Sequence, residues 1–169
     1  MNKRSALIIL FITVITAFFG VDAVAQGGVV TVGGEVEKPL KLDEAAMQQM
    51  KQVHVLATAH KDHKQHDYTG VMLSEIIKES GAIPAGQLRG IYLAKYVLVK
   101  ASDGYQAVIA LPEIDTAFTD KVIILANKED GKPLSNEAGP FQIIVPGDKR
   151  PARCVRKVVA INILSAKEN

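Results

Sequence analysis

The sequence predicts a mixed α+β fold in which many short strands are joined by turns and interrupted by two or three short helices. Short apolar runs rich in Val and Ile recur along the chain, separated by Gly, Pro, Asn and Asp, as is typical of strands and turns. Residues 73–80 instead have the spacing of an amphipathic helix. Strands and helices do not alternate regularly and no internal repeat is visible, which disfavours a βαβ series.

The first 25 residues have the features of a secretory signal peptide. Their start is basic, residues 6–19 are almost entirely apolar, and residues 23–25 (AVA) have the small-x-small pattern that signal peptidase accepts. We expect cleavage after Ala25, a single mature domain at residues 26–169, and a periplasmic or secreted location. The alternative is an uncleaved membrane anchor, although the apolar run is shorter than the ~20 residues of a spanning helix.

The composition of the mature chain argues against one class of partner. Removing Lys3, Arg4 and Asp22 with the leader lowers the formal net charge from +2 to +1. Nucleic-acid-binding domains usually carry a basic excess, so we expect no nucleic-acid partner. We also expect no membrane association after cleavage.

The first mature elements are an extended segment and a short helix. Residues 27–38 read as a strand interrupted by Gly33 and Gly34, and paired glycines in a strand indicate a bulge or a close backbone approach. Asp43 is a good N-cap for a helix at residues 44–50.

The next elements are a strand at residues 53–59 and the most regular helix of the mature chain. Leu73, Ile76, Ile77 and Ser80 fall on one helical face, and Gly81 follows as a stop signal. After a loop or weak helical turn, we predict these elements from the apolar runs and turn residues: a strand at 91–100, a turn at 102–105, a strand at 106–111, a short helix at 112–115, a strand at 121–126 and a polar turn at 128–133.

The chain closes with a strand at residues 141–145, a basic loop and a strand at 155–164. The loop carries Lys149, Arg150 and Arg153, whose side chains can donate to a phosphate or another anion. An ordinary solvated loop is the alternative, and Asp148 offsets part of its charge.

Two further residues are candidates for lining a binding pocket. Asp103 and Tyr105 lie in the Ser-Asp-Gly-Tyr turn, where a tyrosine hydroxyl at a strand end can face a ligand. A hairpin turn with a supporting aromatic ring is the alternative. No P-loop, Rossmann fingerprint or GxSxG motif offers a competing site.

The single cysteine, Cys154, cannot form an internal disulfide. One interpretation is a buried small apolar residue at the start of the last strand. The other is a reactive thiol, because the basic neighbours Arg153, Arg156 and Lys157 would lower its pKa if it were exposed.

Three histidines, His60, His63 and His66, are spaced as H-x-x-H-x-x-H. Neutral imidazoles bind Zn, Cu or Ni, so this segment is a speculative metal site. A single helix would not gather all three, because residues six apart point away from each other. A polar, solvated loop is the alternative interpretation.

Short motifs in a particular order resemble the oxidoreductase molybdopterin-binding domain of the sulfite oxidase-like superfamily. They cover nearly the whole mature chain, and no single one is diagnostic: GGEVEKPL, YTGVMLSEII, ASDGY, GKPL, GPFQIIVPG and RCVRKVVAINI. The resemblance implies a barrel-like mixed sheet with short helices. It also implies a molybdopterin cofactor whose molybdenum is held by a cysteine thiolate.

The cysteine that the resemblance implies is absent from its expected strand. That strand corresponds to residues 54–59, and neither it nor the loop up to Tyr68 contains a cysteine. The leading hypothesis is therefore an exported, single-domain protein that binds an anionic or pterin-type ligand without normal molybdenum ligation.

Two alternatives remain open at this point. One is an active molybdopterin-dependent oxidoreductase with atypical ligation, for example through Cys154, working with a periplasmic redox partner. The other is a periplasmic transition-metal-binding or accessory protein that uses residues 60–66.

Overall fold

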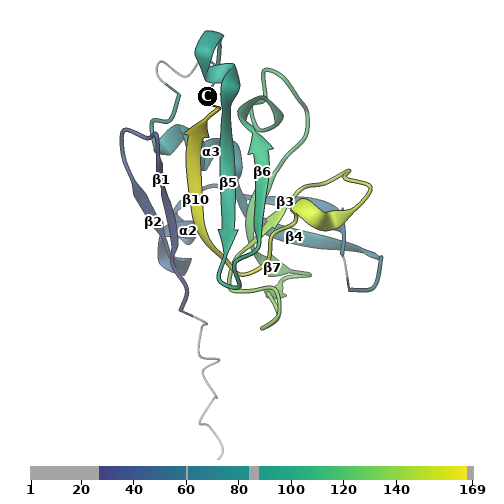
Figure 1. Cartoon of the computed structure of the whole chain (residues 1–169). Coiled ribbons are helices and arrows are strands. Elements are labelled where there is room, and N and C mark those ends of the chain that lie inside the picture. Colours follow the sequence, from purple (N-terminus) through teal and green to yellow (C-terminus); the bar gives the residue numbers. More distant parts are fainter. Residues whose placement is uncertain (1–26, 60, 84–87, 167–169) are drawn as a thin grey trace, which may run out of the picture.

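Two open five-stranded sheets form the framework of the protein in the computed structural model (Figure 1). The structure describes residues 27–59, 61–83 and 88–166, so the predicted leader and His60 lie outside the described part. Within these ranges, no helix has the length and apolar character that crossing a membrane requires.

The first sheet joins both ends of the described chain. Its strand order is β2-β1-β10-β5-β6; β1 and β10 run parallel, and the other neighbours are antiparallel. Figure 1 shows β1, β10, β5 and β6 side by side, with α2 and α3 drawn behind them. The strand bounds are β1 Val30–Gly34, β2 Leu40–Leu42, β5 Lys95–Ala101, β6 Gln106–Ala110 and β10 Val158–Ser165.

The second sheet is antiparallel throughout. Its order is β3-β4-β7-β8, and β9 also pairs with β7. The strands are β3 Gln52–Thr58, β4 Gln65–Met72, β7 Ile124–Glu129, β8 Lys132–Pro133 and β9 Gln142–Ile144. The α+β class predicted from the sequence is confirmed. The sheets stay open among the described residues, so the fold is barrel-like only in a loose sense.

The helices are short, and local signals fix their ends. In α2 (Glu44–Gln49), Asp43 accepts a hydrogen bond from the Ala46 amide at 2.8 Å, as its N-cap position predicts. In α3 (Leu73–Glu79), the predicted apolar face is buried, and Gly81 follows with a φ of +66°. Three 3-10 helices complete the set: η2 Gly90–Ala94, η3 Leu111–Glu113 and η4 Pro151–Arg153.

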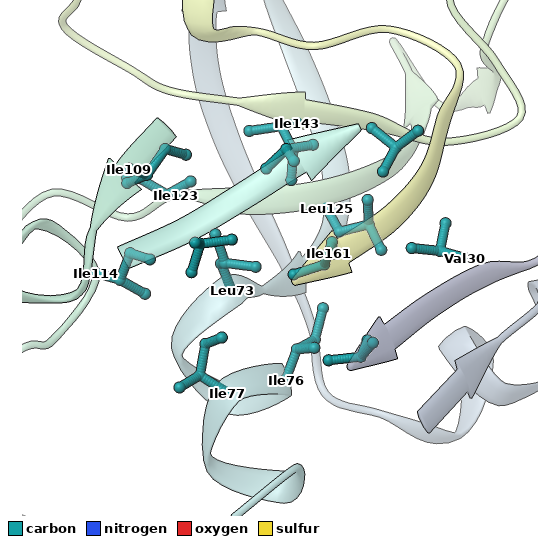
Figure 2. Packing of buried hydrophobic residues seen from close by; sticks show 14 of the residues in the cluster. Val30, Leu73, Ile76, Ile77, Ile109, Ile114, Ile123, Leu125, Ile143 and Ile161 are labelled. Atoms are coloured by element: carbon teal, nitrogen blue, oxygen red, sulfur yellow. The ribbon is translucent and has the colours of Figure 1, made fainter. Parts of the chain in front are cut away.

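The main hydrophobic core lies between the two sheets and includes α3 (Figure 2). Ile76 of α3, Leu125 of β7 and Ile161 of β10 are each fully buried in it. A second, smaller cluster uses the other face of the second sheet and contains Tyr68 and Ile144. The second sheet is therefore apolar on both faces, and the smaller cluster supports the candidate site.

Of the paired glycines of β1, only Gly34 lies as close to a neighbouring backbone as the sequence predicted. A Cβ on Gly34, whose φ is +87°, would lie 2.2 Å from the carbonyl oxygen of Ile163 on β10. Gly33 has room, since the nearest atom to its Cβ would be 3.8 Å away. Gly34 is therefore the glycine that the parallel pairing of β1 with β10 requires.

Three predicted strand boundaries were wrong. The strand predicted at 91–100 begins at Lys95, because residues 90–94 form η2, in which Ile91 is 80% exposed. The strand predicted at 121–126 is β7, which begins at Ile124 and extends to Glu129. The last strand begins at Val158 rather than at 155, so Cys154 lies at the end of η4 and not on the strand.

Two further features of the topology were not predicted. Strand β4 was not predicted, because its first half, with His66 and Asp67, is polar. The closing strands β9 and β10 belong to different sheets, although the amide of Ile143 donates to the carbonyl of Val155 at 2.8 Å. The basic loop therefore connects the two sheets.

Candidate functional site

A cavity of about 510 Å³ lies between the second sheet, the β5–β6 turn and the loop that contains η4. This volume lies within the ~300–1,000 Å³ of typical small-molecule sites. The lining comes from four parts of the chain: residues 57–59, 63 and 68 around β3 and β4, residues 103 and 105, residues 142 and 144, and residues 149–152 and 154–156. Elements far apart in the sequence thus form one site.

The β5–β6 turn contributes a ring that is held in place. The Asp103 carboxylate accepts a hydrogen bond from the Tyr105 amide at 3.0 Å, and the Tyr105 hydroxyl donates to the carbonyl of Ala152 at 2.7 Å. Tyr105 nonetheless stays about half exposed, at 49%. Both sequence-predicted residues therefore line the cavity, and Tyr105 also ties the turn to η4.

Three basic side chains from the closing loop line the same cavity. They are Lys149, Arg150 and Arg156, all exposed, and none of them forms an ion pair with any described residue. Asp103 is the only carboxylate that the described residues contribute to the lining. The cavity is therefore positively charged, which favours anionic ligands.

Arg153 has a different environment from the one expected for an anion-binding residue. Its guanidinium donates two hydrogen bonds of 2.8 Å to Asp148 and one of 2.8 Å to Glu113, and it does not line the cavity. The hydrogen bonds from Arg153 hold the pKa of Asp148 below its ordinary value. Arg153 therefore anchors η4 to η3, while Arg150 stays available.

The floor of the cavity includes Tyr68 of β4, a residue to which the sequence analysis gave no role. Tyr68 is 4% exposed, and its hydroxyl donates to Glu129 at 3.0 Å. Burial raises its pKa well above the ordinary value, and the Glu129 carboxylate adds to that effect. Its position in the YTGV motif was the only signal in the sequence.

Gln142 and Arg156 are two further lining residues that the sequence reasoning missed. Gln142 lies on β9 and is 9% exposed. Its place in an apolar run, as the one polar residue among Phe141, Ile143 and Ile144, was a signal that could have drawn attention to it.

Cys154 lines the cavity, but its thiol is partly enclosed. The Sγ atom accepts a hydrogen bond from the Val145 amide at 3.3 Å. Burial raises the pKa of the thiol and outweighs the opposite effects of the Val145 amide and of Arg153. The structure therefore favours the interpretation of Cys154 as a protonated, packed residue.

The donor set of the cavity does not fit a molybdenum ion held by a deprotonated cysteine. The β3 side of the lining consists of Ala57, Thr58 and Ala59, none of which carries a thiol. The basic residues do fit the anionic part of a pterin cofactor.

The structure describes two of the three histidines, His63 and His66, and their surroundings differ. His63 lines the cavity, whereas His66 contacts Asp130 at 2.6 Å and Asp62 at 3.0 Å through its two ring nitrogens. His60 lies outside the described residues. Within residues 27–59, 61–83 and 88–166, no group of three or more His, Cys, Asp or Glu side chains is arranged to hold a metal ion.

Comparison with known proteins places this geometry in a family. The sulfane dehydrogenase SoxCD from Paracoccus pantotrophus has a similar fold, with a TM-score of 0.63 and 18% sequence identity. The similarity covers 80% of this chain and 38% of that one, so the chain spans well under half of its structural relative. No curated protein sequence matches. Residues 25–169 match the family described as oxidoreductase molybdopterin binding domain. The chain belongs to this family.

Proposed function

We propose that this chain is an exported protein that binds an anionic, pterin-type ligand in the cavity beneath the closing loop. The observation that carries the proposal is the set of three cavity-lining cations, Lys149, Arg150 and Arg156, without carboxylate partners. A pterin cofactor of this family carries a phosphate, which such side chains bind by charge-assisted hydrogen bonds.

The proposal also states that the ligand binds without a cysteine thiolate of this protein as a ligand to molybdenum. When a molybdopterin is bound in this family, the metal supplies two-electron redox chemistry, and a soft thiolate suits that metal. Here β3 offers no thiol, and the Cys154 thiol has a raised pKa and accepts the Val145 amide. The residues present therefore support a site that binds the ligand but lacks the metal-binding cysteine of an oxidoreductase centre.

Ligand affinity tests the assignment of the basic loop. We would titrate the mature protein with 6-hydroxymethylpterin monophosphate by isothermal calorimetry and compare Arg150→Ala with the wild type. Loss of one charge-assisted hydrogen bond is expected to weaken binding on the order of tenfold. Arg89→Ala is the matched control, because Arg89 is exposed and lies outside the cavity lining. Equal affinities of the Arg150 variant and the control would contradict the proposal.

Molybdenum content tests the part of the proposal that concerns the metal. The protein would be exported from cells that make the cofactor, purified and assayed by elemental mass spectrometry. We expect far less than one molybdenum per chain.

A near-stoichiometric content would favour the alternative of an active oxidoreductase with atypical ligation. Cys154 is then the residue to examine, because it lines the cavity. Loss of the metal in Cys154→Ser would identify it as the ligand, and retention would exclude it.

Export is the remaining part of the proposal, and the leader pattern of residues 1–25 supports it. Mass spectrometry of the protein from the periplasm or medium should give a chain that begins at Gln26. A full-length chain found only in the cytoplasm would contradict export.

A further inference from the structure

Gln142 is a buried polar side chain without a hydrogen-bond partner in the described part of the protein. It is 9% exposed, and its amide group makes no hydrogen bond with any described residue. Among the described residues, Ser80 and Asn127 are also buried and polar, and each makes a hydrogen bond: Ser80 donates to the Ile77 carbonyl at 2.7 Å, and Asn127 donates to Glu44 at 2.9 Å. Because no described residue pairs with the Gln142 amide, its donors and acceptor are available to water or to a ligand.

The amide of Gln142 opens into the cavity. Gln142 lines it, and among the described residues Asn127 Oδ1 is the only fully enclosed side-chain nitrogen or oxygen without a partner. The oxygen and nitrogen of Gln142 therefore retain access to the cavity space. A carboxamide offers one acceptor and two donor hydrogens, so it pairs with a ligand edge that presents a donor next to an acceptor.

Tyr105 gives the same cavity an aromatic face. Its hydroxyl and its backbone amide are both hydrogen-bonded, so the ring is fixed while the residue stays about half exposed. A fixed, accessible ring is suited to stacking with a planar ligand.

We propose that Gln142 is the specificity residue of this cavity and that it pairs with the edge of a planar heterocycle. Tyr105 supplies an apolar face for the ring, and the basic residues of the closing loop bind its anionic group. The feature of the ligand that Gln142 recognises is thus a ring edge with adjacent donor and acceptor atoms. This inference rests on the proposed function, whose evidence is the set of basic side chains that bind the anionic group, and it adds the residue that recognises the ring.

Three probes distinguish recognition of the ring edge from binding of the anionic group. Pterin-6-carboxylate has the edge and a charge, 2-naphthoate has a planar ring and a charge without that edge, and inorganic phosphate has the charge alone. The affinities of the wild type, Gln142→Leu and Gln142→Met would be measured by calorimetry. Gln48→Leu is the matched control, because Gln48 is exposed on α2 and lies outside the cavity lining.

We expect Gln142→Leu and Gln142→Met to bind pterin-6-carboxylate on the order of tenfold more weakly, as for the loss of a paired amide contact. Affinities for 2-naphthoate and phosphate should stay unchanged. The melting temperature should stay the same or rise, because an apolar residue of similar size replaces an unpartnered amide.

Three outcomes would overturn the inference. One is unchanged affinity for pterin-6-carboxylate in both variants, and another is an equal loss of affinity for all three probes. The third is a melting temperature lowered by several degrees in both variants, which would make the amide a structural group. Failure of the proposed function is distinguishable, because the wild type would then bind none of the probes or Arg150→Ala would bind them as tightly as the wild type.

Discussion

Gly70, in the middle of β4, is the position at which one methyl group should damage the fold most directly. A Cβ built on Gly70 would lie 2.1 Å from the carbonyl oxygen of Leu125 and 2.6 Å from the Cα of Ala126, both on β7. Ordinary van der Waals contacts of a Cβ lie at 3.4–4 Å. The clash is with backbone on a buried central strand, so no side-chain rotation can relieve it.

The expected cost of Gly70→Ala follows from this geometry. Strands β4 and β7 must separate by more than about 1 Å, and overpacking strain of this kind costs about 1–3 kcal/mol. Such a separation also breaks about two backbone hydrogen bonds of the β4–β7 ladder, each worth about 1 kcal/mol. The free energy of unfolding should therefore fall by about 3–5 kcal/mol.

Urea unfolding followed by far-UV circular dichroism measures this cost, because the protein has no tryptophan. With a slope of about 2 kcal/mol per M, the midpoint should fall by about 2 M. Gly33→Ala is the matched control, since Gly33 also lies in a strand but its Cβ would meet nothing closer than 3.8 Å. This control should be neutral or slightly stabilising. A loss of less than about 1 kcal/mol in Gly70→Ala would refute the reasoning.

Three other side chains give further tests. Arg153→Met should lower the free energy of unfolding by about 1–3 kcal/mol, because it leaves the Asp148 carboxylate, whose side chain is 15% exposed, without its bidentate partner. The Asp130 carboxylate raises the pKa of His66 in the folded protein. The contact therefore stabilises the folded state fully below the pKa of His66 in the unfolded chain, which is about 6.5. This stabilisation is lost as the pH rises through the higher pKa of His66 in the folded protein. The melting temperatures of the wild type and of His66→Gln would be measured with a metal chelator in the buffer, and their difference should be larger at pH 5.5 than at pH 9. The Cys154 thiol, whose pKa burial raises, should react with a disulfide reagent at neutral pH far more slowly than in urea.

Each of these tests has a control or a contradicting result. Arg150→Met is the control for Arg153→Met, because Arg150 is exposed and unpaired and should change stability by less than about 0.5 kcal/mol. Equal losses in the two variants would show that the ion pairs of Arg153 do not stabilise the fold. A pH-independent difference would contradict the role of His66, and a fast reaction of the native protein would contradict the enclosure of Cys154.

Local patterns in the sequence were sufficient to predict the fold class and to place both α-helices to within one residue. The Asp43 cap and the apolar face of residues 73–80 depend on neighbours within one or two turns. The same is true of the turn at residues 102–105 between β5 and β6. The family was predicted from the order of motifs, and the match over residues 25–169 confirms it.

The strand boundaries depended on burial that local patterns do not encode. Residues 91–94 are apolar enough for a strand, but Ile91 is exposed in η2. Conversely, β4 begins with polar residues and still forms a strand, because it pairs with β3 and β7 and because His66 bonds to the distant Asp130. An apolar run predicts a buried strand only if the rest of the chain covers it.

The sequence by itself determined that the closing loop is basic and that residues 54–59, where the family resemblance implies the metal-binding cysteine, contain none. The tertiary structure alone decided which arginine of that loop faces the cavity. Arg150 and Arg153 are three residues apart and chemically identical, yet Arg153 is neutralised by Asp148 and Glu113, and Arg150 is not. Glu113 is 40 residues away in the sequence. The unpartnered amide of Gln142 is likewise visible only in three dimensions. In both cases the physical reason is that charge neutralisation and burial depend on long-range packing, which residue type and spacing do not specify.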